Sequence, residues 1–351
     1  MLHPGPGYRS RVIHLRILAP PDAAEHALDL LCRSDSVANV VHLPGAARHP
    51  EGDVILCDVA REDASVIVSD LRELDIHKEG SIALEEIDTQ ISHAADRAIA
   101  SAQGAPADAV VWEEVEGRTS EDAALSGSFV TFMVLACVLG AMAIFQDSAI
   151  LMIGAMVVGP EFGPIAGFCV ATVSRRRSLA QRSLVALVAG FPLGIAAAFV
   201  AALVFKWTGI TPDDFRSDEH ELAAVISDPG VFSFLVAFAA GTAGTLSLST
   251  AKSGAVIGVL ISATTIPAAA NIGLASAYED WSALGGSAAQ LAINLGSLLA
   301  AGILTLLVQR LLYRRRRVEH LRDPVREAAG LPVGRSRRSP AGVGTRPDGE
   351  G

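Results

Sequence analysis

The chain has 351 residues, of which 50% are hydrophobic and 19% are charged. The apolar residues are concentrated between residues 127 and 313, in several stretches of about twenty that are each long enough to cross ~30 Å of hydrocarbon. This distribution excludes a wholly soluble protein. The net charge of -10 is the sum of about -13 before residue 127, about -2 over residues 127–313 and about +5 in the tail, so it says little about partners.

Residues 1–91 show the pattern of a small α+β domain. Apolar alternation predicts strands at residues 11–18, 37–43, 54–59 and 81–91, and helical periodicity predicts helices that begin at Asp22 and at Glu62. A Pro/Gly-rich loop should separate the two central strands. The order β-α-β-β-α-β is that of a ferredoxin-like domain, which could sense a ligand or serve only in packing or dimerisation. No signal peptide precedes it, so we expect this domain to stay in the cytoplasm.

Two further segments flank the apolar region. Residues 92–126 mix Ala, Gly and acids and should form a partly helical acidic connector. Residues 313–351 are rich in Arg, Pro, Gly and Ser, which is typical of a disordered tail. We expect its Arg314–Arg317 run to lie on anionic lipids, at about 1 kcal/mol for each arginine. Nucleic acid is not an expected partner, because no aromatic residues interleave with the arginines.

The apolar region predicts six transmembrane spans in residues 127–312. Basic residues follow the second, fourth and sixth spans, at Arg175–Arg177, Lys252 and Arg314–Arg317, whereas the opposite loops are acidic. Because basic loops resist translocation, both termini should lie in the cytoplasm of a bacterial plasma (inner) membrane. The spans are expected at about 127–145, 148–173, 179–205, 231–248, 253–275 and 287–312.

An internal repeat relates the two halves of this region. The repeats are residues 127–206 and 231–312, and a shift of 104 positions lays the first on residues 231–310 without a gap and places Arg175 and Arg176 on Glu279 and Asp280. Each half contains an odd number of spans, so the two halves must be inserted in opposite orientations. This predicts an inverted repeat, an arrangement that recurs in transporters with a site near the midplane.

Prolines interrupt corresponding spans of the two halves. Pro160 and Pro164 cannot sit in a regular helix, because each lacks an N–H and clashes with the carbonyl four residues earlier. Pro267 lies three positions from the equivalent of Pro160. Two such breaks predict a transport site, although a pair of packing kinks explains them as well. The candidate site residues are Gly159, Pro160, Glu161, Gly163, Pro164, Ser262, Thr264, Thr265, Pro267, Asn271 and Asn294.

Glu161 lies near the middle of the second span. A carboxylate at this depth costs ~2.5 kcal/mol or more, so it must face water, a partner or a proton. It would suit a proton relay or a cation ligand, or it is a neutral acid bonded to freed carbonyls. Asn271 and Asn294 are either ligands or interhelical contacts. Asp147 and Lys252 open the second and fifth spans as gate residues or interface anchors.

The stretch DSAILMIGAMVVGPEFGPIAG at residues 147–167 and the run SGAVIGV at residues 253–259 carry a family resemblance. They resemble the bacterial and archaeal uncharacterised hydrophobic domain family, domain-of-unknown-function family 389. The resemblance covers about residues 120–312 and implies a multi-pass membrane protein without an established activity. The family commonly has an apolar residue at the position of Glu161, which would restrict any role of Glu161 to a subgroup.

The sequence therefore favours a transporter or channel for an unidentified small solute or ion, regulated by the cytoplasmic domain. A non-transporting, membrane-anchored sensor or scaffold is the alternative. An enzyme is not expected, because the chain lacks H-E-x-x-H, G-x-S-x-G and a phosphate-binding glycine loop. The four cysteines have no metal-ligand spacing, so neither a metal nor another cofactor is expected. Small-residue stripes in the spans suit a homo-oligomer.

Overall fold

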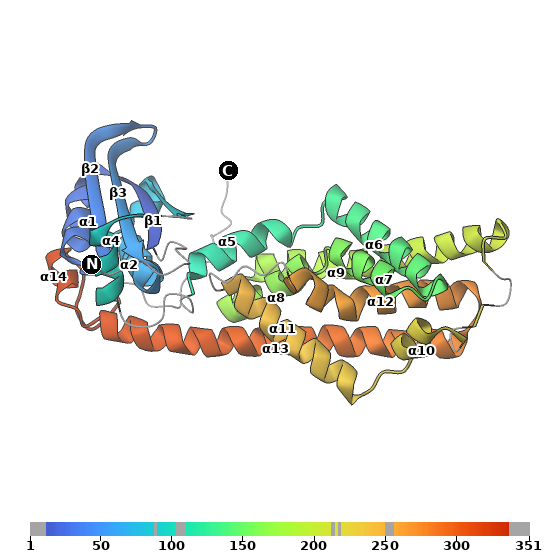
Figure 1. Ribbon diagram of the computed structural model, residues 1–351. Coiled ribbons are helices and arrows are strands. Elements are labelled where there is room, and N and C mark those ends of the chain that lie inside the picture. Colours follow the sequence, from blue (N-terminus) through green and yellow to red (C-terminus); the bar gives the residue numbers. More distant parts are fainter. Residues whose placement is uncertain are drawn as a thin grey trace, which may run out of the picture. The chain divides into compact units, whose positions relative to one another are not determined.

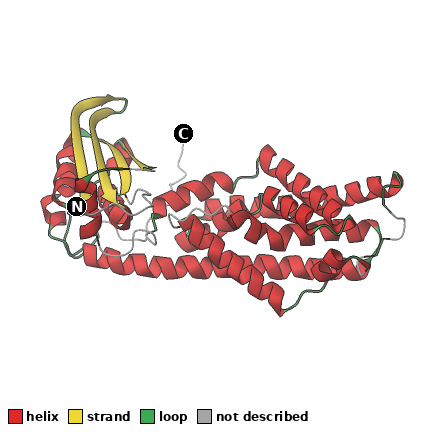
Figure 2. Ribbon diagram, in the orientation of Figure 1, coloured by secondary structure: helices red, strands yellow, loops and turns green. Residues whose placement is uncertain are grey.

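The computed structural model describes residues 12–87, 90–102, 110–211, 215–216, 219–249 and 256–336, without the side chains of residues 118, 249 and 256–264. The chain divides into two compact units. We call residues 1–111 with 311–351 the sheet unit, and Trp112–Arg310 the helical unit. The strands gather in the first unit, and helices form most of the chain (Figures 1 and 2).

The sheet unit is a four-stranded sheet covered by helices. Neighbouring strands are antiparallel, in the order β2-β3-β1-β4. Alternation in β1 directs Ile13, Leu15 and Ile17 into the core, where they meet Leu30 of α1 and Leu71 of α2. The elements are β1 (Val12–Ala19), α1 (Pro21–Arg33), β2 (Val37–Arg48), β3 (Glu51–Ala60), α2 (Arg61–Glu73), α3 (Ile76–Glu79), β4 (Ser81–Glu86), α4 (His93–Ser101) and α14 (Val325–Ala328).

These elements confirm the four predicted strands and two predicted helices, with differences at their ends. The predicted Pro/Gly-rich loop is wrong, because β2 continues through Pro44 and Gly45 to Arg48 and β3 begins at Glu51. The strand absorbs these two residues where the register between β2 and β3 shifts, between Leu43 and Ala47. A bulge tolerates a proline, since no ladder hydrogen bond is needed there.

The carboxyl-terminal segment differs most from its prediction. Instead of a disordered tail, residues 313–320 continue helix α13 (Trp281–His320), and α14 follows. Ala329 and Leu331 are buried, and Ala329 belongs to the core of the sheet unit. Residues 337–351 lie outside the described residues.

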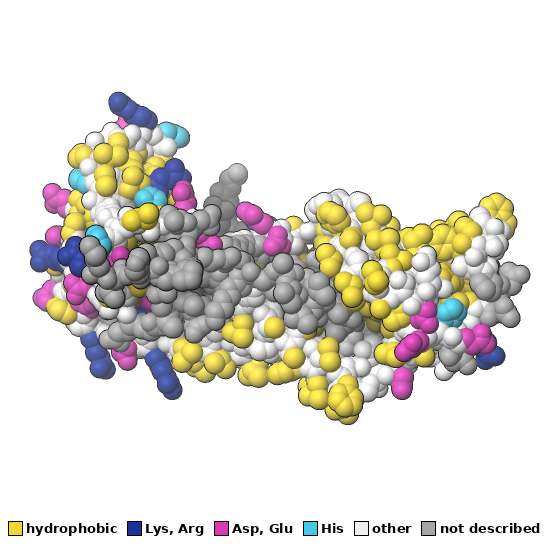
Figure 3. Space-filling view, in the orientation of Figure 1, with side chains coloured by type: hydrophobic (Ala, Val, Ile, Leu, Met, Phe, Trp, Pro, Cys, Tyr) yellow, Lys and Arg dark blue, Asp and Glu magenta, His cyan; other side chains and the backbone are white. Residues whose placement is uncertain are grey.

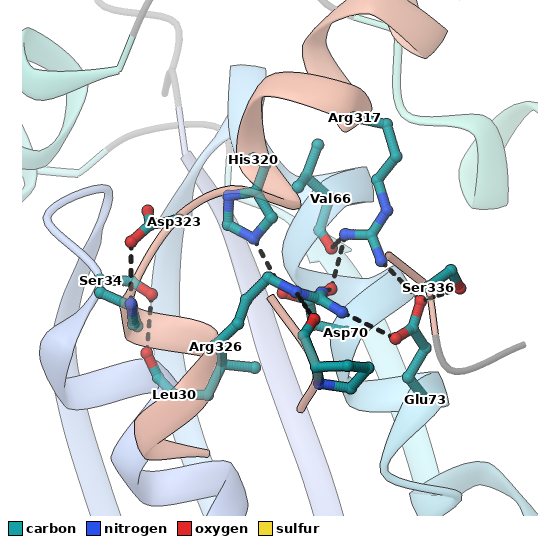
Figure 4. A network of polar contacts seen from close by, with 12 residues as sticks. Leu30, Ser34, Val66, Asp70, Glu73, Arg317, His320, Asp323, Arg326 and Ser336 are labelled. Atoms are coloured by element: carbon teal, nitrogen blue, oxygen red, sulfur yellow. Dashed lines mark hydrogen bonds and ion pairs between the residues drawn. The ribbon is translucent and has the colours of Figure 1, made fainter. Parts of the chain in front are cut away.

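A buried ionic cluster explains why this segment folds. Asp70 and Glu73 on α2 face Arg317, His320 and Arg326, and we call these five residues the tail clasp (Figure 4). Arg326 bonds Asp70, its Nη2 lies 2.8 Å from Glu73 Oε2, and both Arg326 and Asp70 are fully buried. Arg317 Nη1 lies 2.5 Å from Asp70 Oδ1, and His320 Nε2 lies 2.8 Å from Asp70 Oδ2. The carboxylates supply the charge partners that a basic tail needs in order to be buried.

The tail clasp also changes the expectation of lipid binding. Arg317 is engaged in the clasp, and Arg316 Nε lies 3.2 Å from Asp63 Oδ1 of α2. These two arginines are therefore paired with carboxylates of the sheet unit. Arg314 and Arg315 are exposed, and for them contact with anionic lipids stays a prediction.

The helical unit contains the apolar region. Among the described residues, α6, α9, α11 and α13 are long and apolar enough to cross a membrane, and the bent pair α7 and α8 would make a fifth span. Hydrophobic side chains cover much of its visible face (Figure 3). The remaining elements are α5 (Trp112–Asp122), α6 (Gly127–Phe145), α7 (Ala149–Val158), α8 (Phe162–Ser174), α9 (Arg177–Trp207), α10 (Glu221–Ser227), α11 (Val231–Ser249) and α12 (Val256–Ala277).

Arg326→Met should destabilise the sheet unit. The substitution keeps the apolar stem but leaves Asp70 and Glu73 with fewer cations, which should cost about 3 kcal/mol for a broken buried pair. Hydrogen exchange of the α2 amides, followed by mass spectrometry on the full chain, should accelerate by about a hundredfold. Arg322→Met is the matched control, since Arg322 is exposed. Equal exchange in the two variants would show that the clasp does not stabilise the fold.

The tail clasp should also make stability depend on pH in acid. Burial alone would raise the pKa of Asp70, but the hydrogen bond from His320 and the charges of Arg317, His320 and Arg326 outweigh it and hold this pKa below its usual value. The stabilisation is therefore fully present above about pH 3.9 and is lost as the pH falls through the lower folded-state pKa. Calorimetry should find the wild type more stable than Asp70→Asn at pH 6, with the difference shrinking below about pH 3.9. A constant difference would contradict this account.

Candidate functional site

The second predicted span is broken in the structure, as its prolines indicate. Helix α7 ends at Val158, α8 begins at Phe162, and the two axes differ by 51°. The break needs small residues as well as Pro160. A methyl group built on Gly159 would lie 2.8 Å from the Ile266 side chain, and one on Gly163 would lie 2.6 Å from the Asp122 carbonyl oxygen. Glycine at these two positions lets neighbouring chain approach the break closely.

Glu161 follows this break directly and is completely buried, with 0% of its surface exposed. Its Oε1 accepts a hydrogen bond of 2.6 Å from the hydroxyl of Thr265 on α12, which is also buried. Two predicted site residues from the two halves are therefore in direct contact. A carboxyl group in this position can hold a proton or accept a cation, because both forms keep the threonine as a partner.

The predicted break in the fifth span is wrong. Helix α12 runs from Val256 to Ala277 with Pro267 inside it. A lone proline removes one hydrogen bond and strains the preceding turn, whereas the second span has two prolines with Gly159 and Gly163 beside them. Lys252 lies outside the described residues, as do the side chains of Ser262 and Thr264.

Polar residues of α12 and α13 bind neighbouring helices. The Asn271 side-chain amide donates to the hydroxyls of Ser227, at 2.9 Å, and Ser287, at 2.8 Å. Gln290 donates to Asn294 over 3.3 Å. Asn271, Ser287 and Asn294 are buried. The two bonds of Asn271 fit the interhelical role that the sequence left open for it, whereas Gln290 and Asn294 both lie on α13, and an interhelical role for Asn294 stays a prediction.

Asp147 caps the amino-terminal end of the short helix α10. Its two carboxylate oxygens accept hydrogen bonds of 2.9 Å each from the backbone amides of Glu221 and Leu222, at the start of α10. These amides hold the pKa of Asp147 below its usual value. The sequence did not predict this contact, because helix α10 has only seven residues and lies in a loop that reads as acidic and solvated.

A cavity of about 370 Å³ reaches the break. Its wall includes Gly159, Pro160 and Gly163, which lie at the break and close to Glu161 in the sequence. Carboxylates from Glu121 and Asp122 and several hydroxyls line it, together with phenylalanine rings. The lining residues are Thr119, Glu121, Asp122, Ala124, Ser126, Ser128, Phe129, Phe132, Gly159, Pro160, Phe162, Gly163, Ala166 and Leu248. This cavity was not predicted, because residues 92–126 have the composition of a connector, whereas α5 packs on α8 within the helical unit.

No group of three or more His, Cys, Asp or Glu side chains in the described part of the chain could hold a metal ion. The site therefore consists of a buried carboxyl group, its threonine partner, a backbone break and a cavity that leads to it.

Comparison with known proteins gives one match. No curated protein and no solved structure matches the chain. Residues 156–300 match the family model described as "Domain of unknown function (DUF389)". This range runs from the end of α7 through the first half of α13, and it includes Glu161 and Thr265. This match over residues 156–300 confirms the family resemblance that the second span indicated.

Proposed function

We propose that the protein is a membrane transporter for a small solute or ion, built from two inverted three-span halves that meet at Glu161 and Thr265. The observation that carries the proposal is the fully buried Glu161 carboxyl group, which lies at a break in a span and accepts a hydrogen bond from Thr265. Intramembrane carboxyl groups are expensive and typically mark proton or ion pathways.

Helix boundaries support the repeat. Helix α6 covers Gly127–Phe145 and α11 covers Val231–Ser249, so both ends differ by 104 positions. Helices α9 and α13 begin at Arg177 and Trp281, again 104 apart. The short turns before them contain Arg175 and Glu279, which share a left-handed backbone with φ of 57° and 56°. Two unrelated halves would have no reason to share these positions.

Contacts between the halves support a two-fold relation. A methyl group built on Gly302 would lie 2.8 Å from Cys169 Sγ, and one on Gly273 would lie 2.7 Å from Ala198 Cβ. A shift of 104 converts Cys169 into Gly273 and Gly302 into Ala198, so the two contacts exchange, as a two-fold axis requires. Glu161 and Thr265 are themselves 104 apart. A residue that touches its own equivalent lies close to such an axis, and in inverted repeats the axis runs near the midplane.

We infer six spans from this relation: α6, the bent pair α7 and α8, α9, α11, α12 and α13. The arginines at 175–177 then lie on the cytoplasmic side and Glu279 and Asp280 on the outer side, with both termini in the cytoplasm of a bacterial plasma membrane. The strand order β2-β3-β1-β4 supports a ferredoxin-like domain, for which we propose a regulatory role. A sensor or scaffold that does not transport is the alternative.

A cavity at one side of the break favours transport over a scaffold. The cavity beside the first half is lined by Ala166 and Leu248. The corresponding positions in the other half are Ala270 and Ile144, and both are fully buried in one apolar cluster with Phe215. A cavity thus reaches the break on one side, and packed side chains fill the equivalent position on the other.

Glu161→Gln should reduce transport. In proteoliposomes with an imposed pH gradient and an entrapped pH-sensitive dye, the wild type should dissipate the gradient faster than empty vesicles. The amide has nearly the same volume but cannot exchange a proton, so the rate should fall by at least about tenfold, or ~1.4 kcal/mol. Glu279→Gln is the matched control, because Glu279 is exposed at the end of α12 and should transport as the wild type does.

The same vesicles distinguish the two functions. If the wild type moves neither protons nor Rb⁺ nor Cl⁻ under any imposed gradient, the sensor or scaffold becomes the better description. If transport occurs and Glu161→Gln leaves its rate and pH dependence unchanged, the site assignment is wrong although the function stands.

A further inference from the structure

We propose that helix α10 is a lid that closes the outer face of the transport pathway and opens by release of hydrogen bonds at both of its ends. The inference rests on the proposed function for its meaning, because a lid needs a pathway to close. It assigns a role to Asp147, Asn271 and Gly286 that transport alone does not require.

The amino-terminal end of α10 is held by a residue from another loop. Asp147, between α6 and α7, accepts hydrogen bonds from the backbone amides of Glu221 and Leu222 at 2.9 Å each. Asp147 has a left-handed backbone conformation, with φ of 50°, in the turn between α6 and α7. This end of the lid is therefore fixed by one exposed side chain, without a covalent or apolar anchor from that loop.

The carboxyl-terminal end is held by a buried amide. Asn271 on α12 donates to Ser227, the last residue of α10, and to Ser287 on α13, and the Ser227 and Ser287 hydroxyl oxygens are 3.4 Å apart. The Ser227 backbone also packs on Gly286 of α13 so closely that a methyl group there would overlap its carbonyl oxygen. Glycine at this position permits the closed lid.

Helix α10 covers Ala270, the residue equivalent to Ala166 of the cavity. Ala223 in the middle of α10 is fully buried in one apolar cluster with Ala270, Ile144 and Phe215. Ala270 is 104 positions after Ala166, which lines the cavity of the first half. If the two faces open in turn, movement of α10 should open a cavity beside Ala270 like the one that Ala166 lines now.

The lid is short enough to move as one piece. Helix α10 has seven residues, and polar contacts hold both of its ends. The first half differs at the corresponding place, since Gly167 stands where Asn271 stands and brings no amide to Ser183. The hydrogen-bonded latch thus belongs to the closed face.

Thiol labelling of the full chain in detergent tests the lid without any transport assay. In a Cys32→Ser background, which removes the exposed cysteine, Ala270→Cys should react slowly with a membrane-impermeant maleimide. Adding Gly286→Ala should raise its labelling rate by at least tenfold, because the methyl group pushes α10 away. Gly285→Ala is the matched control, because a methyl group there meets nothing within 4 Å, and it should leave the rate unchanged.

A second pair of variants keeps the test decisive if Gly286→Ala does not fold. Asp147→Ala releases the other end of the lid and should raise the labelling of Ala270→Cys in the same direction. Ser128→Cys, at an exposed position that lines the cavity, should react readily in every background and reports an intact fold. Unchanged labelling of Ala270→Cys in both Gly286→Ala and Asp147→Ala would overturn the lid. Absence of ion flux with the expected labelling pattern would instead refute transport and leave the lid standing.

Discussion

A carboxyl group in the middle of an apolar span must find its hydrogen-bond partner within the protein, and this requirement organises the helical unit. Glu161 finds it in Thr265, so α12 must pass directly beside the break between α7 and α8. The break in turn exposes backbone that neighbouring residues must satisfy. Gly159 and Gly163 let Ile266 and Asp122 approach the break closely. The bond between Glu161 and Thr265 thus joins the two halves at the break, together with the close packing of Gly302 on Cys169 and of Gly273 on Ala198.

The sequence predicted the parts of this arrangement that depend on local chemistry. Pro160 and Pro164 identified the break, because proline disrupts a helix wherever it occurs. Glu161 and Thr265 were both candidate site residues, since a polar side chain in an apolar span needs a partner. Their mutual bond was not predictable from either segment alone, since 104 residues separate them. The cavity was also hidden, because α5 carries too weak an apolar pattern to be placed against α8.

The prediction of a disordered tail was wrong because it, too, depended on contacts between residues far apart in the sequence. Its arginines suggest disorder when read locally, because an isolated basic segment has nothing to bury. Asp70, the partner of Arg326, lies 256 residues earlier in the chain, on a helix of another domain by sequence order. Composition predicts disorder only while the charges lack partners. Here α2 places two carboxylates where Arg317 and Arg326 converge.

The differences between the halves carry as much meaning as their likeness. Helix α12 is continuous where α7 and α8 are broken. Asn271 bonds Ser227 and Ser287 where Gly167 merely packs against Ala123 and Ser183, the residues 104 positions earlier. Hydrogen bonds are directional, so they fix one arrangement more strictly than contact between small side chains does. Hydrogen bonds of Asn271 therefore hold the α10 side of the helical unit, whereas Gly167 has no side chain to form them on the cavity side, and this asymmetry is a property of the sequence.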